Sequence, residues 1–157
     1  MPPKPLVDLA ALDLNRIADD IEGIRKYNQQ RFEMEMLSAI VAFNPDERWV
    51  VAYKDCRPLD FWVRGHVPGR PLMPGVLICE CAAQCCSYYY GRTQRQNQFL
   101  GFAGMDAVKF RSQVAPGDRL VMVCRVREIG SRISSFDCQG FVTGKMVFEG
   151  VIHGIAI

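Results

Sequence analysis

Several features that often reveal a protein's function are scarce or absent in this chain of 157 residues. It has only two histidines, no cysteines spaced as Cys-x-x-Cys, and no apolar run approaching the roughly 20 residues of a membrane-spanning helix. A zinc knuckle and a membrane-spanning protein are therefore not expected. The formal net charge is only +2, so binding to nucleic acid through bulk charge is not indicated. The length predicts one domain, residues 1–157, with a substantial core.

The cysteines indicate free thiols. There are seven, an odd number, and the N-terminus lacks the pattern of a secretion signal, so we expect a reducing, cytoplasmic environment. Four of them, Cys79, Cys81, Cys85 and Cys86, crowd into one predicted helix, where Cys79 and Cys81 point in different directions. We interpret them as small residues packed in a buried helix and expect no metal site.

Residues 65–90 predict a rigid loop that runs into a buried helix. Three prolines in the loop each fix φ and disfavour helix at the residue before them. From residue 76 to about residue 90 nearly every side chain is apolar or small, as in a helix buried on all sides, and Gly91 is expected near its C-cap. Glu80 and Gln84 are the exceptions, and their spacing of four places them on one face.

Glu80 requires an explanation, because a carboxylate in an apolar helix costs several kcal/mol unless it is paired or used. His66 lies on the loop just upstream, and the backbone N–H groups of Gly75 and Val76 are free at the helix start. Together they supply a base, an acid and hydrogen-bond donors, the parts for acid–base chemistry beside a carbonyl. The alternative is that His66 and Glu80 form a buried pair that only holds the helix in place.

Two stretches of the chain resemble one enzyme family, the FabZ-type (3R)-hydroxyacyl-acyl carrier protein dehydratases. Residues 65–84 read G-H-V-P-G-R-P-L-M-P-G-V-L-I-C-E-C-A-A-Q, close to the family's active-site pattern of roughly G-H-F-P-x-x-P-x-M/F-P-G-V-L-x-x-E-A-x-A-Q. Residues 102–110, F-A-G-M-D-A-V-K-F, and the following V-A-P-G-D are similar to a second family motif. The resemblance implies an α+β hot-dog fold, in which an antiparallel sheet of about six strands wraps a long central helix. An N-terminal tail and helix, residues 1–27, would precede it.

The resemblance also implies a reaction, the dehydration of (3R)-hydroxyacyl thioesters on acyl carrier protein to trans-2-enoyl thioesters in fatty acid or related lipid biosynthesis. His66 is then the expected base at C2, and Glu80 the acid that protonates the leaving hydroxyl. The Gly75 amide, with that of Val76, would polarise the thioester carbonyl, and Gln84 would orient Glu80. The other expected substrate-binding residues are Phe61, Met73, Phe102 and Gly104.

The reaction implied by the resemblance needs no metal and no organic cofactor, and its partner is acyl carrier protein. Between residues 91 and 132 there are eight cations and three acids, an excess that would suit an acidic carrier or simply form a solvated strand surface. In the family, the histidine of one subunit meets the glutamate of its partner. The resemblance therefore implies a homodimer with shared active sites, commonly joined as a trimer of dimers into a hexamer, and an inactive monomer.

One stretch departs from the family. Where the family has roughly L-P-H-R-x-P-F-L-L-V-D, residues 27–37 clearly keep only Arg31 and Phe32, and Glu33 and Glu35 replace apolar residues. This departure leaves the tunnel lining and the acyl-chain length open. Three alternatives remain. A hot-dog thioesterase is disfavoured by the proline-rich loop. An isomerising FabA-type dehydratase typically carries Asp where this chain has Glu80. A non-catalytic acyl-binding subunit would need neither the histidine nor the glutamate.

Hydrophobic spacing predicts the remaining elements. Leucine and isoleucine recur every three or four residues between positions 14 and 24, which predicts a helix over residues 6–27 with Asp13 as its cap. Strands are expected at residues 34–42, 48–54, 99–102, 107–110, 119–129, 133–142 and 146–157, separated by turn sequences. His153 has no acid or cysteine near it in the sequence, so we interpret it as an ordinary strand residue.

Overall fold

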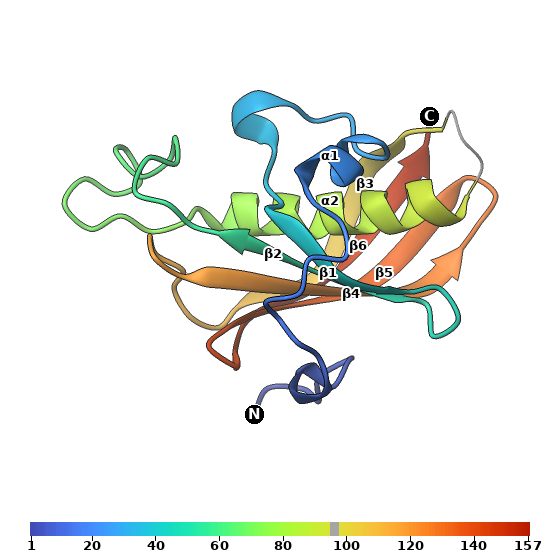
Figure 1. Cartoon of the computed structure of the whole chain (residues 1–157), viewed down its shortest axis with the longest axis horizontal. Coiled ribbons are helices and arrows are strands. Elements are labelled where there is room, and N and C mark those ends of the chain that lie inside the picture. Colours follow the sequence, from blue (N-terminus) through green and yellow to red (C-terminus); the bar gives the residue numbers. More distant parts are fainter. Residues whose placement is uncertain (95–97) are drawn as a thin grey trace.

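The computed structural model describes residues 1–94 and 98–157, which form one six-stranded sheet and one long helix (Figure 1). The strands are β1 (Ala39–Asn44), β2 (Trp49–Asp55), β3 (Leu100–Phe110), β4 (Arg119–Ile129), β5 (Ile133–Val142) and β6 (Lys145–Ala156). The helices are α1 (Ile21–Arg25), α2 (Gly75–Thr93) and two 3₁₀ helices, η1 (Leu9–Ala11) and η2 (Phe32–Met34). All strand pairs are antiparallel, in the order β1-β2-β4-β5-β6-β3. Arg95, part of the predicted basic stretch, lies outside the described residues.

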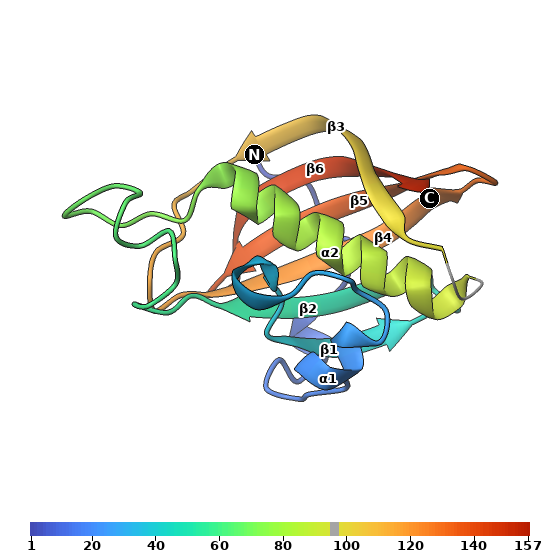
Figure 2. The ribbon, with the colours of Figure 1, turned by 90° about the horizontal axis from the view of Figure 1, so that it is seen from above.

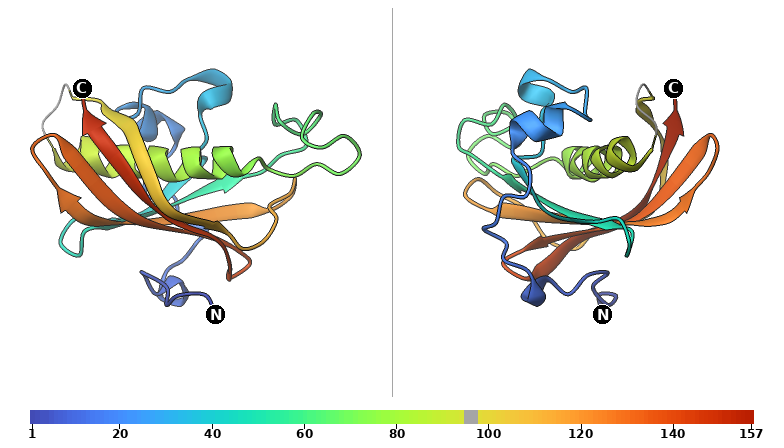
Figure 3. Two further views of the ribbon diagram at one scale, coloured as in Figure 1. Left: turned by 180° about the vertical axis from the view of Figure 1, so that it is seen from behind. Right: turned by 45° about the vertical axis from the view of Figure 1, so that its right-hand side comes forward.

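Helix α2 lies in the concave face of the sheet, which curves around it (Figures 2 and 3). Its side chains are buried on nearly every turn, and Leu120, Met122 and Phe148 of the inner sheet face are fully buried in the same core. Burying an apolar side chain of this size contributes roughly 1.5–3 kcal/mol. The predicted α+β architecture, a central helix wrapped by six antiparallel strands, is confirmed. None of the described helices is long and apolar enough to cross a membrane.

The predicted helix over residues 6–27 is wrong. Only Ile21–Arg25 form an α-helix, and its cap is Asp20 rather than Asp13, because the Asp20 side chain accepts a backbone N–H at 3.0 Å. The leucines of residues 6–14 instead pack on the outer face of the sheet, opposite α2 (Figure 1). The Leu6 N–H donates to Gln139 Oε1 at 2.8 Å, so sheet side chains hold this backbone. The apolar residues whose spacing suggested a helix instead belong to a segment that packs over the sheet.

Other differences from the predicted elements concern where they begin and end. The strand expected at residues 34–42 begins at Ala39, because η2 precedes it. The strands expected at 99–102 and 107–110 are a single strand, β3, whose pairing with β6 is interrupted by irregularities. Helix α2 continues past Gly91 to Thr93, and a Cβ at Gly91 would meet the Tyr27 Cβ at 3.0 Å, so this glycine permits close packing instead of capping. The strands predicted at 119–129 and 133–142 are confirmed at both ends.

An ion pair holds the stretch that departs from the family pattern. Glu35 accepts two hydrogen bonds from the Arg25 guanidinium, each of 2.9 Å, and these bonds lower the pKa of the Glu35 carboxyl. A lowered pKa stabilises the fold above the pKa of the unfolded glutamate, and this stabilisation is lost as the pH falls through the folded-state pKa.

We expect Glu35→Gln to lower the urea midpoint slightly at neutral pH, because Arg25 is partly exposed and screened by solvent. At acidic pH, where the wild-type carboxyl is protonated, the substitution should have no effect. Urea titrations of both proteins at the two pH values test this, and an equal loss at both would contradict the assignment.

Candidate active site

A proline-rich loop between β2 and α2 carries His66 and is fixed by backbone hydrogen bonds. The His66 N–H donates to the Trp62 carbonyl at 2.8 Å, and the Leu72 N–H donates to the His66 carbonyl at 2.7 Å. The loop rejoins the core where the Met73 N–H donates to the Val114 carbonyl at 2.7 Å. The peptide bond after His66 is cis. The loop projects beyond one end of the sheet (Figure 1). Its Trp62 side chain is buried.

The His66 ring is exposed in the single chain, and one of its nitrogens is already engaged. His66 Nδ1 lies 2.8 Å from the Leu72 carbonyl oxygen. A carbonyl oxygen only accepts, so Nδ1 carries the proton. In the neutral ring Nε2 is then unprotonated and can accept a proton, which is the tautomer that a general base requires.

The N-terminus of α2 provides backbone donors next to this loop. Pro74 stands at the N-cap and has no side chain that could satisfy the first N–H groups. Among the described residues, no hydrogen bond is made by the N–H of Gly75 or Val76. A Cβ at Gly75 would lie 2.8 Å from the Phe110 ring, so glycine lets the end of β3 approach the helix start. These N–H groups lie at the positive end of the helix dipole, where they can stabilise a developing negative charge.

Gln84 holds Glu80 in a fixed orientation. The Gln84 side chain is buried, and its Oε1 accepts the Met36 N–H at 3.0 Å. Its Nε2 must therefore donate, and it donates to the Met34 carbonyl at 2.7 Å and to Glu80 Oε1 at 2.8 Å. Asn28 adds a bond to the Gln84 backbone carbonyl at 2.9 Å. Residues 27–37, the stretch that departs from the family pattern, thus supply the groups that orient Gln84.

Glu80, which is half-buried, lines a small cavity of about 70 Å³ between α2 and the β3–β6 edge of the sheet. The other lining residues are Gln30, Ala83, Cys86, Ser87, Phe99, Leu100, Gly101, Phe102, Ile152, His153 and Gly154. Of the residues expected at the site, Glu80 and Phe102 both line this cavity. His66 is not among the lining residues, so one chain does not place it in the same cavity as Glu80.

The remaining predicted substrate-binding residues lie elsewhere. Phe61 is 53% exposed and borders a separate surface hollow with Asp60 and Trp62. Met73 is buried in the core, with its Sδ 3.9 Å from Cys56 Sγ. Gly104 lies in β3 opposite His153 and outside the cavity lining. Val76 is exposed at the helix start. A single chain therefore gathers only part of the predicted set around Glu80.

Three polar residues near Glu80 were missed by the sequence interpretation. Gln30 and Ser87 line the cavity, and the Gln30 Oε1 is buried without a hydrogen-bond partner among the described residues. His153 lies in β6 as expected, but its ring also contacts Ser135 Oγ at 2.8 Å and Asp106 Oδ2 at 2.6 Å. No local motif marks these residues, because they come together only through the packing of α2 on the sheet.

The fold defines the class of protein. A long buried helix in the concave face of a six-stranded antiparallel sheet is the arrangement of the hot-dog proteins. Two solved structures share it. The dehydratase heterocomplex ApeI:P from Xenorhabdus doucetiae has a TM-score of 0.73 at 15% identity, over 85% of this chain and 90% of that chain. A mutant of the thioesterase PA1618 from Pseudomonas aeruginosa has a TM-score of 0.67 at 15% identity, over 92% of this chain and 99% of that chain. At such identities the likeness shows the fold alone.

Sequence comparison narrows the class to a family. Residues 28–151 match the FabA-like domain. The 3-hydroxyacyl-[acyl-carrier-protein] dehydratase FabZ of Lawsonia intracellularis is 33% identical over 137 residues, 85% of this chain and 89% of that protein. The enzyme of the same name from Teredinibacter turnerae is 36% identical over 137 residues, 85% of this chain and 93% of that protein. The chain belongs to the FabA-like family, among its FabZ-type dehydratases, which confirms the resemblance found in residues 65–84.

Proposed function

We propose that this chain removes water from (3R)-hydroxyacyl thioesters on acyl carrier protein and forms trans-2-enoyl thioesters in fatty acid or related lipid biosynthesis. The observation that carries the proposal is the orientation of Glu80 by Gln84 at the wall of a cavity. A purely structural glutamate would not require a cavity beside it. The names of the FabZ relatives support the same reaction class.

The Gln84 contact determines which oxygen of Glu80 can transfer a proton. Because Gln84 Nε2 donates to Glu80 Oε1, a protonated Glu80 carries its proton on Oε2. That proton passes to the C3 hydroxyl of the substrate as the C3–O bond breaks, and the leaving group departs as water.

His66 supplies the complementary base. Its Nε2, left unprotonated by the Nδ1 contact with Leu72, takes the proton from C2. The electron pair of the broken C–H bond forms the C2–C3 double bond by way of an enolate, whose oxygen the N–H groups of Gly75 and Val76 stabilise. Return of the proton from His66 to Glu80 restores both residues, so the net products are the enoyl thioester and one water. No metal or organic cofactor takes part in this scheme.

We also propose that two chains complete each site, because His66 is exposed while Glu80 lies in a cavity that His66 does not line. The homodimer, and a trimer of dimers, follow from the family resemblance.

The exposed Arg64 and Arg70 flank His66 on the loop and would attract an acidic carrier. The seven cysteines, all buried thiols, suit the reducing cytoplasm proposed as its location.

The proposed activity is tested by hydration of crotonyl-acyl carrier protein, followed as the loss of enoyl absorbance. Turnover by the folded protein is expected. Absence of turnover on both short and long enoyl chains, with folded and dimeric protein, would overturn the proposal.

Gln84→Met is expected to lower kcat by about tenfold with little change in KM, since it removes the donor that orients Glu80 but not the cavity. It should also lower the melting temperature, because the Met36 N–H and the Met34 carbonyl lose their partner. Steady-state kinetics and thermal melts measure the two effects.

Asn28→Leu is the matched control for this prediction. It removes a buried hydrogen bond to the Gln84 carbonyl but leaves the Gln84 side chain in place. We expect lower stability with nearly unchanged kcat. If both variants lose kcat in proportion to their loss of stability, Gln84 has only a structural role.

A further inference from the structure

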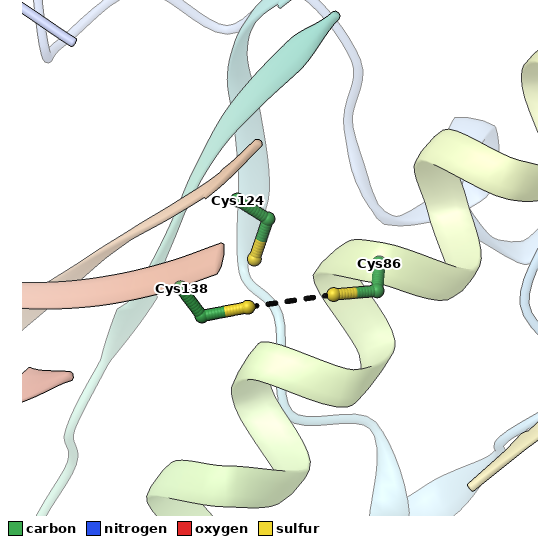
Figure 4. Close-up of side chains that lie close together, drawn as sticks. All are labelled: Cys86, Cys124 and Cys138. Atoms are coloured by element: carbon green, nitrogen blue, oxygen red, sulfur yellow. Dashed lines mark hydrogen bonds between the residues drawn. The ribbon is translucent and has the colours of Figure 1, made fainter. Parts of the chain in front are cut away.

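Three cysteines from three different elements meet in the core beneath the cavity. Cys86 comes from α2, Cys124 from β4 and Cys138 from β5, and their sulfurs point toward one another (Figure 4). All three sulfurs lie within 4.8 Å of one another, and Cys86 Sγ and Cys138 Sγ are 3.5 Å apart. Each residue is at most 1% exposed. The sequence interpretation considered only cysteines close together on the helix and did not foresee this cluster.

The spacing of the sulfurs suits a single central atom. Three thiolates bound to one ion with zinc-like bonds of about 2.3 Å lie about 3.8 Å apart. The Cys86–Cys138 separation of 3.5 Å is close to this value and Cys124 Sγ lies within 4.8 Å of both, so small side-chain movements could place all three sulfurs around one atom. Sulfur-only ligand sets select soft, thiophilic centres over oxygen-loving ions such as magnesium.

The electrostatics of the cluster favour a product without net charge. Burial raises the pKa of the Cys86 and Cys124 thiols. Burial and the Asp137 carboxylate oppose ionisation of Cys138, whereas hydrogen bonds from the Cys124 and Cys86 thiols lower its pKa. Three thiolates on a divalent ion would leave one negative charge in the core, whereas three on a trivalent centre leave none.

The cavity beside Glu80 offers a route to the cluster. Cys86 is one of the residues that line it, so a small neutral molecule that enters the cavity comes next to one residue of the cluster. A charged, hydrated cation would have to lose its water in the same narrow space.

We propose that Cys86, Cys124 and Cys138 form a binding site for a trivalent thiophilic metalloid, with arsenite as the probe. Arsenite in its neutral form, As(OH)₃, reacts with three thiols. Three As–S bonds form, three As–O bonds break, and each hydroxide leaves as water with a thiol proton. No electrons are transferred. The product is neutral, matches the apolar core, and ties α2 to β4 and β5.

The experiment measures arsenic retained by the folded, full-length protein in a phosphine reductant that contains no thiol. The protein is refolded with arsenite, so that access is not limiting, and is then dialysed against a monothiol. Mass spectrometry under native conditions counts the arsenic. One arsenic per chain and a raised melting temperature are expected, since a ligand that binds only the folded state stabilises it.

Cys124→Ala and Cys138→Ala should each lose the retained arsenic and the rise in melting temperature. Cys81→Ala is the matched control, because Cys81 is fully buried on the same helix but lies outside the cluster. It should bind like wild type. Circular dichroism shows whether each variant folds. If one fails to fold, Cys→Ser at the same position replaces it.

Three results would overturn the proposal. The folded wild-type protein could retain no arsenic. The cluster variants could retain as much arsenic as the Cys81→Ala control, which would place the binding elsewhere. A parallel arm with Zn²⁺ could show tight, stoichiometric binding that arsenite fails to match, which would contradict the argument from a neutral product.

Discussion

Glu80→Gln is expected to lower the rate of crotonyl-acyl carrier protein hydration by about 10²–10⁴-fold, the usual contribution of a positioned acid or base. The substitution keeps the shape of the side chain and its contact with Gln84, but the amide has no carboxylic proton to give. His66→Ala should produce a loss of the same size, because the loop would then present no base. Steady-state rates on a single acyl chain length measure both variants beside the wild type.

Glu128→Gln is the matched control, since Glu128 is exposed on β4 and belongs to neither motif. It should leave the rate unchanged. An unchanged rate in either His66→Ala or Glu80→Gln would show that the proposed acid–base mechanism is wrong.

The same assay separates the competing activities on this fold. A thioesterase would release free carrier thiol from the substrate, which a thiol reagent detects. An isomerising dehydratase would also form a cis-3-enoyl product, which chromatography resolves. We expect neither product above the level of the Glu80→Gln variant.

The sheet and the central helix were predictable because strong local sequence signals mark where their elements begin and end. Turn sequences at residues 116–118, 130–132 and 143–145 flank β4 and β5, and both strands begin and end where the sequence predicted. The N-terminal region was mispredicted for a physical reason. Apolar residues that recur every three or four positions indicate only that these side chains are buried. The outer face of the sheet buries the apolar side chains of residues 6–14 without a helix.

The site was predictable only where its residues are consecutive in the chain. The loop, the helix start and Glu80 lie within 16 residues, so one motif specified them. Gln30 and Ser87 reach the cavity by tertiary packing, and Cys124 and Cys138 meet Cys86 across two strands. No spacing rule connects positions so far apart, and their proximity follows from the register of β4 on β5, where Cys124 lies opposite Cys138.

Mixing two inactive variants is expected to restore activity if each site uses two chains. When His66→Ala and Glu80→Gln proteins are refolded together, about half of the dimers are mixed, and each mixed dimer has one intact site out of two. The mixture should therefore regain about a quarter of the wild-type rate, while each variant refolded alone stays inactive. A site built within one chain predicts no recovery at all.

The reciprocal mixture gives an independent test of the shared site. Wild type refolded with an equal amount of the double variant, His66→Ala with Glu80→Gln, forms mixed dimers in which both sites are broken if the histidine and glutamate come from different chains. The rate should then fall to about a quarter of that of an all-wild-type sample. Sites within one chain would give about a half, because every wild-type chain would keep its own site. Recovery in the first mixture with loss to a quarter in the second can arise only if His66 of one chain works with Glu80 of another.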